Sequence, residues 1–238
     1  MKNSIIHLCL IVITLASCSK DCDLENNTQD PTTPDLTLAE GVWQGYFEQP
    51  EVAGLKYEYP TSITIEGTNE NLSGGIFQNV IENGEYLLFG SEEFGGLRNI
   101  ESTPSYQNDN EVYLDFDDGG SSFPYWCEQL YTELTLSDDG KSLTGSFTGT
   151  DNGVPCVSGD VTLKRLIIKS NLSLCVGESI ELEGTNIKWY SDLTFNDLIA
   201  TGSKYEVSGS GTQKVYITQT FDGIESSVYG LEYFVEAC

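Results

Sequence analysis

From residue 41 onward, short runs of alternating apolar and polar residues are separated by turn-forming residues, and no stretch keeps an apolar period near 3.6. Alternation with period two is typical of strands that bury one face. We therefore expect an all-β protein. In its first part the pattern predicts strands at 41–47, 62–66, 75–79, 86–89, 112–116, 130–136, 142–148 and 159–166.

Tight turns are predicted where Asn83-Gly84, Asp118-Gly119 and Asp139-Gly140 fall between these runs. Asn, Asp and Gly accept the positive φ that short hairpins require. About eight strands in about 130 residues fit a small antiparallel barrel, which closes on itself and leaves no edge. A meandering sandwich is the alternative.

Residues at the two ends of this segment point to one barrel family. Gly41-Val42-Trp43 lies in the first strand and Arg165 in the last, where Val161, Leu163 and Arg165 share one face by alternation. This pair resembles the calycin and lipocalin-like barrels, in which a Gly-x-Trp and a late Arg pack together at the closed end. The resemblance implies an inward Arg165 that covers Trp43 through a cation–π contact.

The last 70 residues carry a second series of motifs: Cys175-Val176-Gly177-Glu178, Trp189-Tyr190, Gly202-x-x-Tyr205, Tyr216-x-Thr-Gln219 and a final Cys238. This order resembles the Ig-like modules repeated in Bacteroidetes surface and gliding-associated proteins. The resemblance implies a small β-sandwich at about 166–238, with Trp189 in its core.

Four cysteines fall in the two predicted β segments, namely Cys127, Cys156, Cys175 and Cys238. Four cysteines allow three connectivities. In an exported protein, disulfides within each segment are the economical choice, because each pair then closes a loop inside its own domain.

The N-terminal sequence predicts that the protein is exported. Lys2 precedes an apolar run over 5–13, and small residues follow up to Cys18, as in a secretory signal. Leu15-Ala16-Ser17-Cys18 resembles the lipobox of bacterial lipoproteins, which implies that 1–17 is removed and that Cys18 is lipidated. Residues 18–35 are polar and predict a disordered tether. Their acidic start resembles the surface-export signal of Bacteroidetes-type lipoproteins, which implies display on the outer face of the outer membrane.

Charge and histidine content exclude several functions. With 37 acidic and 11 basic side chains the formal net charge is −26, which argues against nucleic-acid partners. The one histidine lies at position 7, inside the predicted signal. The mature chain therefore lacks imidazole bases, Ser-His-Asp systems and His-ligated zinc.

One acidic turn offers two kinds of chemistry. Asp115 and Asp117 share a strand face about 7 Å apart, a spacing that suits the paired carboxylates of glycoside hydrolases. The same residues with Asp118 are candidate ligands for calcium, although their spacing is not that of an EF-hand. No other cofactor is expected.

Aromatic residues indicate binding instead of catalysis. Tyr57 and Tyr59 alternate along one predicted strand face, and Tyr125 and Trp126 form part of an aromatic loop beside the acidic turn. Aromatic rings near carboxylates suit sugar recognition, because the ring stacks on the apolar sugar face while carboxylates accept hydroxyl hydrogen bonds.

The resulting hypothesis is a lipid-anchored cell-surface protein: signal 1–17, tether 18–35, barrel domain 36–165 and Ig-like domain 166–238. Outer-membrane lipid holds it through Cys18, and it binds or presents a glycan, small molecule or protein partner without catalysis. A carboxylate-dependent glycoside hydrolase and a purely structural envelope or adhesion component are the alternatives.

Overall fold

The computed structural model describes residues 37–238 except 52, 84, 88–95, 102–103 and 117–128. Within these ranges, the segments in which apolar and polar residues alternate form strands. The fold class is all-β, as predicted. Within these ranges we find no helix that is long and apolar enough to cross a membrane.

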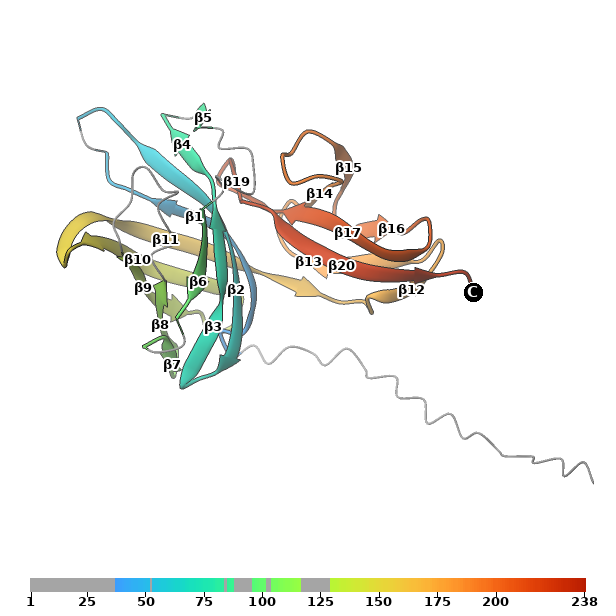
Figure 1. Ribbon diagram of the computed structural model, residues 1–238, viewed down its shortest axis with the longest axis horizontal. Coiled ribbons are helices and arrows are strands. Elements are labelled where there is room, and N and C mark those ends of the chain that lie inside the picture. The colour runs from blue at the N-terminus through green and yellow to red at the C-terminus, as the bar shows by residue number, and fades with distance from the viewer. Residues whose placement is uncertain (1–36, 52, 84, 88–95, 102–103, 117–128) are drawn as a thin grey trace, which may run out of the picture. The chain divides into compact units, whose positions relative to one another are not determined.

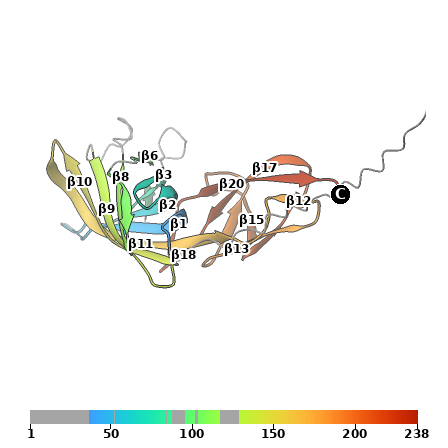
Figure 2. The same ribbon diagram turned by 90° about the horizontal axis from the view of Figure 1, so that it is seen from below.

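Eight antiparallel strands close into a barrel in the order β1-β2-β3-β6-β8-β9-β10-β11, and β11 returns to pair with β1 (Figures 1 and 2). Of the two architectures that the sequence left open, the first segment therefore adopts the barrel. Its strands are β1 (Gly41–Glu48), β2 (Tyr57–Thr68), β3 (Asn71–Gln78), β6 (Gly96–Ile100), β8 (Glu111–Phe116), β9 (Gln129–Leu136), β10 (Ser142–Asp151) and β11 (Val154–Ile168).

Seven of the eight barrel strands coincide with predicted ones. The prediction at 86–89 falls instead on β5 (Glu85–Leu87), which forms a hairpin with β4 (Val80–Glu82) beside β2 and outside the barrel ring. The eighth barrel strand is β6, and the short β7 (Tyr106–Asn108) pairs with β8.

The closed end of the barrel is built around Trp43 and Arg165, which face each other across β1 and β11. The guanidinium carbon of Arg165 lies 4.4 Å from the centroid of the Trp43 ring, so the predicted cation–π contact is present. The segment before β1 covers this end. Arg165 donates to the carbonyls of Leu38 and Glu40, and Trp43 Nε1 donates to the Ala39 carbonyl at 2.7 Å.

Large apolar side chains fill the barrel interior from every barrel strand whose side chains are described, including fully buried Trp43, Phe47, Phe116 and Phe147. Two inward glycines let neighbouring strands approach closely. A Cβ at Gly145 would lie 2.0 Å from the Glu133 carbonyl oxygen, and one at Gly45 would lie 2.0 Å from that of Thr162. Only glycine fits at such a backbone contact.

The rest of the chain packs as a two-sheet sandwich around a second apolar core. Trp189 is fully buried there, stacks on Tyr205 at 5.3 Å and donates to the Gly202 carbonyl. The strands are β12 (Ser173–Cys175), β13 (Ser179–Glu183), β14 (Lys188–Tyr190), β15 (Leu198–Thr201), β16 (Lys204–Glu206), β17 (Gly211–Thr218), β18 (Thr220–Phe221), β19 (Ile224–Glu225) and β20 (Tyr229–Glu236).

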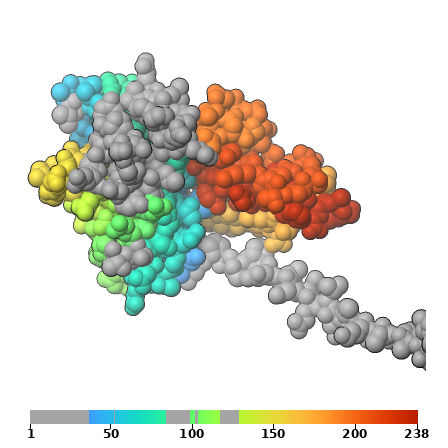
Figure 3. Space-filling model, viewed as in Figure 1, coloured from blue at the N-terminus to red at the C-terminus, as the bar shows by residue number. Residues whose placement is uncertain are grey.

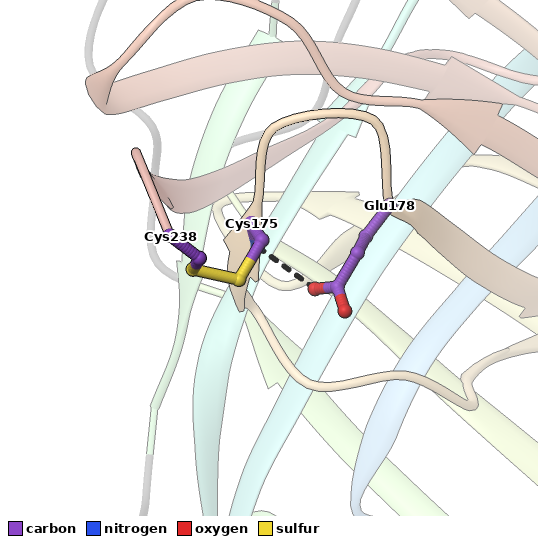
Figure 4. The surroundings of a disulfide bond; sticks show 3 residues. All are labelled: Cys175, Glu178 and Cys238. Atoms are coloured by element: carbon purple, nitrogen blue, oxygen red, sulfur yellow. Dashed lines mark hydrogen bonds between the residues drawn. A yellow bond between two sulfur atoms is a disulfide. The ribbon is translucent and has the colours of Figure 1, made fainter.

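A disulfide joins Cys175 to Cys238, with the Cα atoms 5.6 Å apart (Figure 4). It ties parallel neighbours β12 and β20 and closes a 63-residue loop, which is worth about 4 kcal/mol in the chain-entropy picture. Gly177, at φ +87°, turns the chain so that the Glu178 carboxylate accepts the Cys175 N–H at 2.8 Å. Cys156 also belongs to a disulfide, and Cys127 lies outside the described residues.

Barrel and sandwich share strand β11, which contains the predicted boundary at 165/166 and continues into pairing with β13. Buried hydrogen bonds add to this link. Gln44 Nε2, on the outer face of β1, donates to the carbonyls of Ile217 (2.7 Å) and Ser227 (3.0 Å). Ser227 Oγ donates to the Pro60 carbonyl at 2.6 Å.

Candidate functional site: a groove on the outer face of the barrel

Three tyrosines form a row across the outer face of neighbouring strands: Tyr106 on β7, Tyr113 on β8 and Tyr131 on β9. The rings of Tyr106 and Tyr113 lie 5.6 Å apart at 19°, and those of Tyr113 and Tyr131 lie 6.2 Å apart at 28°. They point outward because alternation sends Val112 and Leu114 into the barrel core. We call these three residues the tyrosine row.

A groove of about 660 Å³ runs beside the tyrosine row and across β8–β11. We call it the tyrosine groove. Its lining residues are Tyr106, Glu111, Val112, Tyr113, Glu133, Leu134, Thr135, Gly145, Ser146 and Asp160. Three of them carry carboxylates, two carry phenols and two carry aliphatic hydroxyls, and this lining includes no Lys or Arg. Such a surface accepts hydrogen bonds and favours neutral or cationic ligands over anions.

Asp115 lies on the same outer face, directly across from Tyr131 in the β8–β9 register. Its backbone is fixed from the neighbouring segment, because its N–H donates to Ser105 Oγ at 2.9 Å and its carbonyl accepts the Glu101 N–H at 2.8 Å. Burial and the nearby Glu101 carboxylate raise the pKa of Asp115. The pKa of Tyr113 is also raised, by burial and then by Asp115, so its phenol keeps its proton as a donor.

The other predicted ligand-binding residues lie elsewhere. Tyr57 and Tyr59 do share a strand face, and that face points into the barrel. Tyr59 is 3% exposed and packs edge-on against Phe147, with the centroids 6.2 Å apart, while Tyr57 packs against the same core. Burial raises the pKa of Tyr59. The structure therefore brings neither tyrosine to the outer groove near Asp115.

Four further predicted positions, Asp117, Asp118, Tyr125 and Trp126, lie outside the described residues. The carboxylate pair and the three-aspartate calcium site are therefore represented here by Asp115 alone. Among the described residues, no group of three or more His, Cys, Asp or Glu side chains is arranged to hold a metal ion.

The sequence contains a signal for the tyrosine row, although these tyrosines are not among the predicted binding residues. Tyr113 and Asp115 alternate with apolar residues in one predicted strand, and Tyr131 and Glu133 do so in the next. Pairing those two strands places all four side chains on one outer face. No local pattern indicates Asp160, because it joins the groove only through the pairing of β10 with β11.

Comparison with protein-family models found no family that matches the chain, and comparison with curated proteins found no similar protein. What the structure defines is therefore a class: a closed eight-stranded antiparallel β-barrel, joined through its last strand to a disulfide-tied β-sandwich, with an acidic, tyrosine-flanked groove on its outer face.

Proposed function

We propose that the protein binds a glycan in the tyrosine groove, without turnover, while a lipid on Cys18 holds it at the outer surface of a Bacteroidetes-type outer membrane. The observation that carries the binding step is the row of three tyrosines beside carboxylates and hydroxyls. Aromatic rings pack on the apolar face of a sugar, and carboxylates accept hydrogen bonds from its hydroxyls.

The anchor suits this role. The chain from Cys18 to Thr37 makes 19 residue-to-residue steps and spans at most about 63–68 Å when fully extended, at about 3.3–3.6 Å per step. The chain then enters the barrel at its closed end, where Arg165 and Trp43 bind the carbonyls of 38–40. A tether of this length can hold the barrel, and with it the tyrosine groove, clear of the membrane surface.

A carboxylate-dependent glycoside hydrolase is the second candidate, and one observation favours it. The pKa of Asp115 is raised by burial and by Glu101. An upward shift of a carboxyl pKa is the direction that general-acid catalysis on a glycosidic bond requires. A screen against glycans separates the two candidates, because only a hydrolase would release product.

The test uses a soluble form that begins at Ser19 and therefore keeps every described residue, screened against immobilised glycans and then titrated. We expect saturable binding without product, and a loss of at least tenfold in affinity for Tyr106→Ala and for Tyr113→Ala. Tyr216→Ala, which removes a partly exposed tyrosine from the sandwich strand β17, is the matched control. Melting curves check that each variant is folded.

Three results decide between the candidates. Glycan affinity that is unchanged in both groove variants would place the site elsewhere, and no retained glycan would refute glycan binding. Product formation that disappears in Asp115→Asn would replace the binding proposal with the hydrolase.

A further inference from the structure

A second hollow lies where the outer face of the barrel meets the start of β20. In the space-filling view, red side chains of β20 adjoin cyan side chains of the barrel (Figure 3). The hollow has a volume of about 370 Å³, and we call it the junction hollow. It shares no lining residue with the tyrosine groove.

The register of three strands explains why a hollow forms there. Gly75 on β3 pairs with Thr64 on β2 and with Asn99 on β6. These three residues line the hollow, and Gly75 contributes no side chain between its two polar neighbours. One step along β3 on the same face, Phe77 stands beside this gap. The barrel thus supplies a floor without side chains, one aromatic wall and a polar edge.

Another part of the wall comes from the sandwich and is tied to the barrel by hydrogen bonds. Tyr229 lines the hollow and packs against the sandwich core. The chain just before it is fixed to the barrel by two fully buried residues: Ser227 Oγ donates to the Pro60 carbonyl, and Gln44 Nε2 donates to the Ser227 carbonyl. Because this part of the wall is already fixed, a ligand that binds there loses little free energy in ordering it.

The polar groups define the ligand. Glu66 supplies an exposed carboxylate, and Ser62 and Thr64 supply hydroxyls. Burial, and then the negative charge of Glu66, raise the pKa of Tyr229, so its phenol keeps its proton. The lining contains no Lys or Arg, which disfavours anions. A single carboxylate is too few for a dedicated cation site.

We infer that the junction hollow is a second binding site, for a single neutral sugar unit, with its ring between Phe77 and Tyr229 and its hydroxyls on Glu66 and Thr64. The aromatic walls would cover the apolar faces of the ring, and the carboxylate would accept two hydroxyl hydrogen bonds. This inference is independent of the proposed glycan binding, because the two sites have different residues.

The experiment titrates the form beginning at Ser19 with glucose, galactose, mannose and N-acetylglucosamine, using ligand-observed NMR and calorimetry. We expect one of these sugars to bind, and Glu66→Gln with Thr64→Val to lower its affinity at least tenfold. Both changes keep the side-chain volume. The matched control is Glu70→Gln with Thr68→Val, which makes the same changes at exposed positions outside the lining.

The variants separate this inference from the proposed function. Monosaccharide binding that survives Tyr113→Ala and is lost in the Glu66→Gln, Thr64→Val pair supports the junction hollow, whatever the glycan screen shows. Binding that is lost in Tyr113→Ala and kept in that pair overturns it. A wild-type protein that binds none of the four sugars overturns it as well, and leaves longer glycans in the tyrosine groove untouched.

Discussion

Replacing Arg165 by Met tests the account of the closed end of the barrel. The Arg165 side chain is buried, lies over the Trp43 ring and donates to the carbonyls of Leu38 and Glu40. Hydrogen bonds from a charged donor contribute about 1.5–3 kcal/mol each, and a desolvated cation–π contact contributes about 2 kcal/mol. Burying a guanidinium costs several kcal/mol, roughly half of that gain.

The net loss expected for Arg165→Met is therefore about 2–4 kcal/mol of unfolding free energy, or about 5–10 °C in Tm for a domain of this size. The free energy of unfolding of Arg165→Lys should lie between those of wild type and Arg165→Met. A lysine ammonium keeps the charge, but it lacks the flat guanidinium that can donate to two carbonyls while it stacks on the Trp43 ring. Urea unfolding followed by tryptophan fluorescence measures both, since Trp43 reports directly on this end.

The adjacent residue gives the control. Lys164 points to the outer face and donates to Ser142 Oγ at 2.6 Å, so Lys164→Met should change the unfolding free energy by no more than about 1 kcal/mol. If Arg165→Met unfolds at the same urea concentration as Lys164→Met, then the contacts with Trp43 and the entering segment do not stabilise the barrel and the reasoning is refuted.

Two further predictions concern the face that carries the tyrosine groove. Gly145→Ala should destabilise the barrel by about 1–3 kcal/mol, because the new Cβ meets the Glu133 carbonyl oxygen at 2.0 Å. In Gly230→Ala the one close contact is with the flexible tip of Lys214, and Tyr216 lies at an ordinary contact distance of 3.6 Å, so this variant should melt like wild type. Equal melting temperatures for the two variants would contradict this. Asp115→Asn should raise stability at pH 7, since the folded pKa of Asp115 lies above its ordinary value of 3.8 and ionisation therefore opposes folding. This gain in stability should shrink as the pH falls through the folded pKa of Asp115 and vanish below 3.8. Urea midpoints of wild type and Asp115→Asn at several pH values measure it, and a gain that stayed constant with pH would disprove the prediction.

The sequence predicts most of the barrel because its strands alternate cleanly. Val112 and Leu114 face inward and Tyr113 outward as the period of two requires. The Trp43–Arg165 contact is the one that the resemblance to lipocalin-like barrels implies. Strand β6 is not predicted from the sequence, because Gly96–Ile100 is short and its apolar and polar residues do not alternate. It is held by pairing with β3 on one side and β8 on the other, which no local pattern reveals.

The candidate site is less predictable than the fold for the same reason. The sequence pairs Asp115 with its neighbour Asp117, but within the described residues its partners come from elsewhere in the chain: Tyr131 across the β8–β9 ladder and Glu101 just after β6. Alternation places Tyr57 and Tyr59 on one strand face without indicating whether that face is buried, and Tyr59 is buried. Long-range register supplies the missing information in both cases.

The link between barrel and sandwich also has a functional consequence. Gln44 is fully buried on the outer face of β1, where an isolated barrel would expose it together with Val42 and Leu166, which pack in the sandwich core. Each of these residues needs the sandwich to be buried or hydrogen-bonded, so the two parts stabilise each other. A ligand in the junction hollow would contact both, and by linkage it would raise the stability of the joined pair more than that of either part alone.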